Sequence, residues 1–146
     1  MKKFIFIAIF GLITMFAQAQ MATITVPTGL TYISQTTDYT LTNTTASYLL
    51  IKAPQHFIAT QDVLVQLTDG ATPHTNVAVS LWGRKFDTGA WVAIGSAVNW
   101  KTTTTDTTII ISNATANRYR DYKINYVGTG TGTTTIGLQQ FKLFLE

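Results

Sequence analysis

One region of this chain is rich in aromatic and basic side chains, which are residue types suited to recognising a ligand. The aliphatic residues Val79 and Leu81 alternate with Ser80 and Trp82, so we expect the aromatic side chains to point away from the face that the aliphatic ones bury. Flat aromatic rings bind the apolar side of sugar rings, and guanidinium, carboxylate and amide groups can hydrogen-bond sugar hydroxyls. Aromatic residues and arginine are also enriched at protein interfaces. The candidate ligand or interface face consists of Trp82, Arg84, Phe86, Trp91 and Tyr119.

Residues for catalysis or metal binding are sparse. The two histidines, His56 and His74, lie eighteen positions apart beside proline-marked turns, and we expect both at the surface. A zinc site needs three or four convergent ligands. No serine lies in a G-x-S-x-G pattern, and most aspartates look like turn or strand-edge residues rather than a catalytic pair. We therefore predict no catalytic residue, no metal site, no cofactor and no enzymatic activity.

The glycine-rich run from Gly128 to Gly132 is superficially similar to a phosphate-binding loop. No Lys-Ser/Thr follows it, and a strand rather than a helix is expected next, so the resemblance fails. Because this run offers few side chains to pack, we predict a flexible connection between two strands.

Alternation of apolar and polar residues dominates the rest of the chain, and no stretch shows a 3.6-residue apolar repeat of helical length. Alternating stretches begin near Val63, Val77, Val92 and Tyr119, and further strands are expected at Ala22–Val26, Leu30–Ile33, Tyr39–Asn43, Tyr48–Ala53, Thr107–Ser112 and Thr135–Leu145. Turn residues separate them at Pro27-Thr28-Gly29, Asp69-Gly70, Asp87-Thr88-Gly89 and Asn113-Ala114-Thr115. The apolar residues of the last strand change parity near Gln139-Gln140, which predicts a β-bulge there. Roughly eight to ten short strands predict an all-β fold, an antiparallel β-sandwich of jelly-roll type, with a closed barrel as the alternative.

The first nineteen residues have the pattern of a secretory signal peptide. Lys2 and Lys3 precede an apolar run that ends in Ala17-Gln18-Ala19, a small-x-small cleavage pattern. The run is shorter than the about 20 apolar residues that span a bilayer, although an uncleaved anchor is the alternative. We therefore expect residues 1–19 to be removed and residues 20–146 to form a single exported domain, located in the periplasm, at the cell surface or outside the cell, with no stable membrane insertion after cleavage.

The composition of the expected mature domain excludes several function classes. Without Lys2 and Lys3, eight basic residues remain against seven acidic ones, which gives a net charge of +1. No basic stripe indicates nucleic-acid binding. The chain has no cysteine, so disulfides and thiolate metal sites are excluded. Its 28 threonines suit extended strands, because a branched Cβ favours the pleated conformation.

Several strand segments resemble those of small β-sandwich virion proteins from tailed phages of Bacteroidetes-type hosts. The resemblance covers roughly residues 60–146 and is carried by Val79–Phe86, Trp91–Gly95, Asp106–Ile111, Arg118–Lys123 and Phe141–Leu145. It implies a decoration, fibre-tip or tail-associated subunit that assembles through sheet faces and edges. The ending from Arg118 to Leu145 is also similar to the last strands of galactose-binding-like sugar-recognition domains. The signal peptide departs from the phage pattern and favours action at the host envelope.

The sequence therefore predicts a non-catalytic, exported structural or adhesive module of a virion or cell surface. Its partners would be protein subunits, most simply copies of itself in a homo-oligomer, or a surface glycan. The alternative function is carbohydrate binding through the aromatic face, and coverage of that face by a loop or another subunit stays open.

Overall fold

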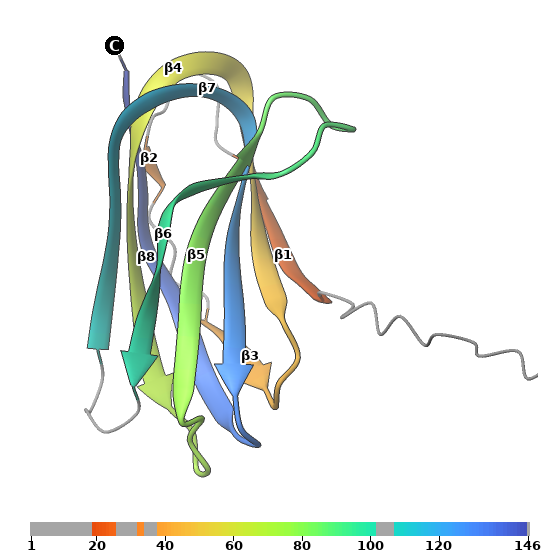
Figure 1. Ribbon diagram of the computed structural model, residues 1–146, viewed down its shortest axis with the longest axis vertical. Coiled ribbons are helices and arrows are strands. Elements are labelled where there is room, and N and C mark those ends of the chain that lie inside the picture. Colours follow the sequence, from red (N-terminus) through yellow and green to blue (C-terminus); the bar gives the residue numbers. More distant parts are fainter. Residues whose placement is uncertain (1–18, 26–31, 34–37, 102–106, 146) are drawn as a thin grey trace, which may run out of the picture.

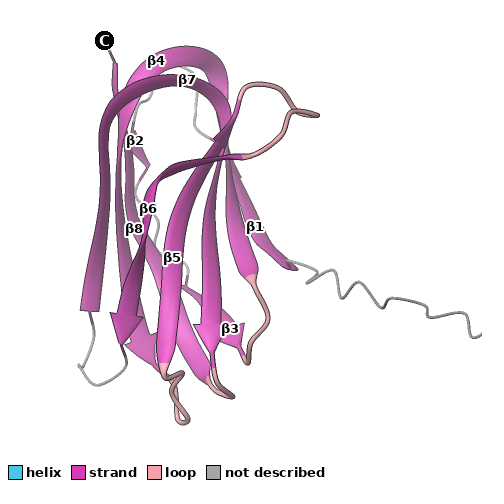
Figure 2. Cartoon of the chain, in the orientation of Figure 1, coloured by secondary structure: helices cyan, strands magenta, loops and turns pink. Residues whose placement is uncertain are grey.

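The computed structural model describes residues 19–25, 32–33, 38–101 and 107–145, and every regular element in these ranges is a β-strand (Figures 1 and 2). Within those ranges no helix is long and apolar enough to cross a membrane. The strands are β1 (Ala19–Thr25), β2 (Tyr32–Ile33), β3 (Asp38–Thr42), β4 (Ser47–Asp69), β5 (Asn76–Arg84), β6 (Val92–Lys101), β7 (Thr107–Thr129) and β8 (Thr133–Leu145).

Two face-packed sheets share their two longest strands. β4 and β7, each of 23 residues, pair antiparallel along their length and arch together over one end of the molecule (Figure 1). One sheet has the strand order β1, first part of β4, second part of β7, β5, β6. The other has the order first part of β7, second part of β4, β8, with β2 and β3 both pairing with β8. The antiparallel β-sandwich predicted from the sequence is confirmed. The hydrogen-bonded path ends at β2 and β6 rather than closing into a barrel.

β1 is the exception to the antiparallel pattern, because it pairs parallel with β4. Its register runs from Ala19 opposite Ser47 to Thr25 opposite Lys52, with an irregularity between Gln20 and Ala22. The expected cleavage point after Ala19 therefore falls at the first residue of this strand. Residues 1–18 and the predicted turn at Pro27-Thr28-Gly29 lie outside the described residues.

The core lies between the two sheets and follows the alternation seen in the sequence. On β5, for example, the fully buried Val77 and Val79 alternate with half-buried residues. The largest fully buried side chains are Tyr122, Tyr126 and Phe141. Burial of such side chains contributes about 1.5–3 kcal/mol each. In β6, Ile94 and Trp100 are buried in this core, whereas Val92 at the start of the strand is 51% exposed.

The predicted bulge in the last strand is confirmed. Leu64 of β4 pairs with Gln140, but the next residue, Val65, pairs with Leu138. Gln139 is thus the extra residue, and it lets both halves of β8 bury their apolar residues in the same core.

The predicted turn at Asn113-Ala114-Thr115 is wrong, because these residues lie inside β7. Gln61 of β4 pairs with Asn113 and Ala59 pairs with Asn117, so three residues of β7 stand opposite one residue of β4. The Asn113 side chain bonds the backbone of Thr115 through both its amide nitrogen and its amide oxygen. The local bonding typical of a turn is present, but it serves a strand irregularity instead.

The expectation that His74 lies at the surface is also wrong. Its side chain is fully buried and joins three loops or strands: Nε2 lies 2.8 Å from the carbonyl oxygen of Asn43, and Nδ1 lies 2.8 Å from the hydroxyl of Thr134. A carbonyl oxygen only accepts, so Nε2 carries a proton and donates it. Gly128 lies against this ring, where an added Cβ would fall 2.5 Å from Nε2. The start of the glycine-rich run is therefore a close-packed contact rather than a loose connection.

Candidate ligand-binding face

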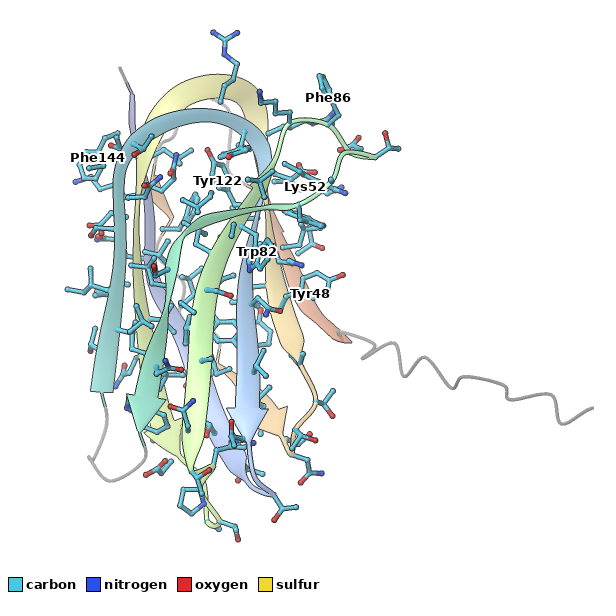
Figure 3. All side chains as sticks on the ribbon, viewed as in Figure 1. Tyr48, Lys52, Trp82, Phe86, Tyr122 and Phe144 are labelled. Atoms are coloured by element: carbon cyan, nitrogen blue, oxygen red, sulfur yellow. The ribbon has the colours of Figure 1, made fainter. Side chains whose placement is uncertain are left out.

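The outward side of the first sheet gathers aromatic and charged side chains from three neighbouring strands. Trp82 of β5 pairs with Lys123 of β7, and Tyr48 of β4 pairs with Asn125, so these positions share the face opposite the core. Tyr48, Trp82 and Lys52 lie along one side of the molecule, with Phe86 beyond them in the loop between β5 and β6 (Figure 3). Neighbouring strands lie about 5 Å apart, which brings side chains from all three strands within reach of one another.

Three aromatic rings surround the ammonium group of Lys123. Its Nζ lies 5.1 Å from the ring centroid of Trp91, 5.4 Å from that of Trp82 and 5.5 Å from that of Tyr48. Distances within about 6 Å permit cation–π attraction. The lysine is only 9% exposed. Burial lowers the pKa of Lys123, and the nearby positive charge of Arg84 lowers it further.

Arg84 links this cluster to a buried carboxylate. Its Nε donates to Oδ2 of Asp121 at 2.8 Å, and its Nη2 lies 2.6 Å from the same oxygen. Asp121 is fully buried, and its Oδ1 has no hydrogen-bond partner among the described residues. The guanidinium carbon of Arg84 also lies 4.7 Å from the ring centroid of Trp91. Asp121 thus fixes Arg84, and Arg84 in turn supports the tryptophan.

The loop of residues 85–91, which brings Trp91 to this face, is held by polar contacts. Nη1 of Arg84 donates to the carbonyl oxygen of Asp87, and the Asp87 carboxylate forms an ion pair of 3.2 Å with Arg120. The amide of Gly89 donates to the carbonyl oxygen of Phe86 at 2.9 Å, which closes the predicted turn. These contacts order the loop before any ligand arrives.

Phe86 lies apart from the aromatic cluster. It is 63% exposed and lines an open hollow of about 430 Å³ together with Lys85, Gly89, Ala90, Val92 and Tyr119. Two exposed apolar side chains, those of Phe86 and Val92, line this hollow.

Tyr119 does not lie on the outward face with Trp82. It is 7% exposed, packs edge-to-face on Tyr122 with ring centroids 6.0 Å apart, and belongs to the core. Its ring covers Gly83, where an added Cβ would fall 2.5 Å from ring atoms. The alternation from Tyr122 back to Tyr119 fails because β7 bends here, opposite an irregular stretch of β4 between Lys52 and Phe57.

We define the aromatic–basic face as Tyr48, Trp82, Arg84, Trp91 and Lys123. Sequence reasoning found Trp82, Arg84 and Trp91 from alternation and missed Tyr48 and Lys123. Tyr48 and Lys123 are each next to core residues in their strands, so alternation alone indicates that both side chains point away from the core. The remaining information is the pairing of β7 with both β4 and β5, which no local pattern encodes.

No cluster of three or more potential metal ligands occurs among the described residues. The Asp121 carboxylate beside the aromatic–basic face is occupied by Arg84. This arrangement offers stacking surfaces and positive charge.

The sandwich fold recurs in solved structures, although no protein-family model and no curated protein matches the sequence. The enzymatically active domain of tailspike protein 4 from Bacteriophage CBA120 is similar at a TM-score of 0.51 and 11% identity, over 78% of this chain and 19% of that one. A carbohydrate-binding module specific for non-crystalline cellulose, CBM28, is similar at a TM-score of 0.50 and 10% identity, over 72% of this chain and 73% of that one. A CBM4 structure covers 77% of this chain at a TM-score of 0.47 and 14% identity. This chain thus spans about a fifth of the tailspike chain, and identities this low show likeness of fold alone.

Proposed function

We propose that this protein is a non-catalytic, exported adhesive module that binds a glycan through its aromatic–basic face. The observation that carries the proposal is the convergence of Tyr48, Trp82 and Trp91 around Lys123 on one sheet face. Rings held by different strands and a loop form a stacking surface that costs little entropy to organise when a ligand binds. Hydrogen-bond donors on Arg84 and Lys123 lie within that surface and suit sugar oxygens.

The fold supports this proposal. A carbohydrate-binding module specific for non-crystalline cellulose has a similar fold, which supports a role in binding carbohydrate. The signal peptide predicted at residues 1–19 would bring the face into contact with polysaccharides at the cell envelope or beyond.

A glycan array tests the proposal with two matched substitutions. We expect saturable binding by the protein, loss of binding in Trp82→Ala and Trp91→Ala, and retention in Phe144→Ala, whose aromatic ring is 45% exposed but belongs to β8 in the other sheet. Alanine removes a stacking ring, and stacking is worth about 0.5–1.5 kcal/mol beyond the area buried. Near-ultraviolet circular dichroism checks that each variant is folded. Binding that survives both tryptophan substitutions, or no binding of any glycan, would refute the proposed site.

A structural role through self-assembly is the second candidate function. The exposed apolar residues Phe86 and Val92 beside the hollow in the β5–β6 loop favour it, because clustered exposed apolar side chains mark interaction surfaces. Light scattering should then show trimers or larger species that dissociate in Phe86→Ser. A monomer at all concentrations would exclude this role.

A further inference from the structure

We infer that the β5–β6 loop and the neighbouring part of the arch form a second interaction surface, which docks peripherally on an anionic lipid surface with the Phe86 ring among the headgroups. This inference goes beyond the proposed function, because it uses residues outside the aromatic–basic face. We name this surface the basic end, and it consists of Lys52, Lys85, Phe86, Val92, Arg118 and Arg120.

The basic end combines segments of β4, β7 and the β5–β6 loop. On β7, Arg118 and Arg120 flank Tyr119, which lines the hollow of this loop. Both arginines are exposed, and Arg120 reaches the loop through its ion pair of 3.2 Å with a loop carboxylate. Lys52 and Phe86 lie on one side of the molecule, with Phe86 nearer the arched end (Figure 3).

Positive charge is concentrated at the basic end. Two described carboxylates beside it are each paired with an arginine, Asp87 with Arg120 and Asp121 with Arg84. Among the described residues no ion pair involves Lys52, Lys85 or Arg118, and all three side chains are exposed. Counting the two pairs, five basic residues stand here against two acidic ones, a formal sum of +3, whereas the expected mature chain carries +1. The other described acidic residues belong to the second sheet and are Asp38, Asp62 and Asp69.

The loop also presents apolar side chains. Phe86 is 63% exposed and Val92 is 51% exposed, and both line the open hollow of about 430 Å³. Exposed apolar side chains with a polar rim mark protein or membrane interaction sites. The stems of lysine and arginine can lie along apolar surface while their charged ends reach the phosphates of lipid headgroups. The basic end thus offers both contacts that an anionic lipid surface requires.

Charge and shape favour a lipid surface over other occupants. A second copy seated on the same hollow about a two-fold axis would face Lys85 and Arg118 with their own like charges. The loop projects from the sheet (Figure 1), and a projecting ring can enter a planar headgroup layer, whereas an acidic protein would need a matching concave site. Each lysine or arginine near an anionic leaflet adds to the attraction. The contact is peripheral and reversible, and it needs no membrane-spanning segment.

Flotation with phospholipid vesicles tests this inference. The vesicles contain phosphatidylcholine alone, or an equal mixture of phosphatidylcholine and phosphatidylglycerol. We expect the protein to bind the anionic vesicles about tenfold or more tighter than the neutral ones, and the difference to shrink as salt is raised. Any contribution from residues 1–19 is the same in every variant and cancels when variants are compared.

Matched substitutions assign the contact to individual residues. Phe86→Ser should weaken binding to anionic vesicles about tenfold or more, because the ring no longer enters the headgroup layer. Lys85→Gln and Arg118→Gln should each weaken binding about fivefold, since each removes one cation. The controls are Phe144→Ser and Lys142→Gln on β8, in the other sheet, and both should bind as the unaltered protein does.

A fluorophore reports which end of the molecule docks while every residue of the basic end stays in place. The chain has no cysteine, so Thr88→Cys in the β5–β6 loop and Thr45→Cys in the β3–β4 loop each give one attachment point for an environment-sensitive dye. Both threonines are exposed, and the β3–β4 loop lies at the end away from the arch (Figure 1). With anionic vesicles, the emission at position 88 should shift to the blue and the emission at position 45 should stay unchanged.

Several outcomes would overturn the inference. These are equal binding of neutral and anionic vesicles, an equal emission shift at positions 45 and 88, and vesicle binding that Phe86→Ser and Lys85→Gln leave unchanged. Absence of vesicle binding would also overturn it. In that case, binding of poly-glutamate would indicate an acidic protein as the occupant, and self-association lost in Phe86→Ser would indicate a second copy. Glycan binding that depends on Trp82 is measured separately, so failure of this inference leaves the proposed function standing.

Discussion

Arg84 and Asp121 form the buried ion pair beneath the aromatic–basic face, and their removal should have unequal costs. Arg84→Met leaves a carboxylate that is fully buried, with one oxygen already lacking a partner. Asp121→Ala leaves a guanidinium whose side chain is 17% exposed and which still contacts the Asp87 carbonyl oxygen and the Trp91 ring. The unpaired charge in Asp121→Ala is therefore better solvated, and keeps more contacts, than the unpaired charge in Arg84→Met.

These contacts set the expected magnitudes. Breaking a buried pair costs about 3–5 kcal/mol, and we place Arg84→Met near the lower end, at about 3 kcal/mol, because both guanidinium contacts use a single carboxylate oxygen. Asp121→Ala should cost about 1–2 kcal/mol, since unmade hydrogen bonds to a partly exposed group cost less. The double variant should cost less than the sum of the two.

Urea unfolding followed by tryptophan fluorescence measures these free energies. The control is Arg120→Met, which breaks the Arg120–Asp87 pair, whose side chains are 44% and 53% exposed. An exposed pair contributes about 0–1 kcal/mol, so this substitution should leave the free energy of unfolding almost unchanged. Equal losses in Arg84→Met and Arg120→Met, or a greater loss in Asp121→Ala than in Arg84→Met, would refute the reasoning from burial.

Two further predictions concern buried groups elsewhere in the sandwich. His74→Leu should lower the free energy of unfolding by about 2–3 kcal/mol, because the Asn43 carbonyl and the Thr134 hydroxyl are left without the imidazole. A loss below about 0.5 kcal/mol would contradict the buried hydrogen bonds of His74. Nitrogen NMR of the native protein should show the proton on Nε2. Burial raises the pKa of Tyr122 from 10.0 to about 12, so its protonated form contributes stability that is fully present below pH 10 and lost as pH rises to about 12. Urea unfolding across that range should show a fall in the free energy of unfolding that is smaller by about 2–3 kcal/mol in Tyr122→Phe, and the remaining fall comes from Tyr126, whose pKa burial also raises. An identical fall in both proteins would contradict this assignment.

Local pattern was sufficient for the parts of the fold that depend on alternation. The parity change at Gln139 predicted the bulge, because a period of two leaves no other way to keep Leu138 and Phe141 in one core. The same rule placed Trp82 opposite Leu81. Each of these predictions uses only residues that are neighbours within one strand.

Pattern failed where the chain bends or pairs at long range. Tyr119 was expected beside Trp82, but the bend of β7 turns it into the core. The Asn113 side chain makes hydrogen bonds to the Thr115 backbone that are typical of a turn, but it makes them inside strand β7. Lys123 gained its aromatic neighbours from the order of β4, β7 and β5, and that order is set by packing of the whole sandwich rather than by any local signal. Two of the five residues of the aromatic–basic face, Tyr48 and Lys123, were therefore beyond sequence reasoning.

The passage of β4 and β7 through both layers has a thermodynamic consequence. Neither layer can come apart while the other persists, because each would have to break hydrogen bonds along a strand that the other still holds. Melting should consequently be all-or-none, with calorimetric and van't Hoff enthalpies in agreement. A chain without disulfide cross-links gains from this, since a single cooperative transition exposes no half-open layer to proteases.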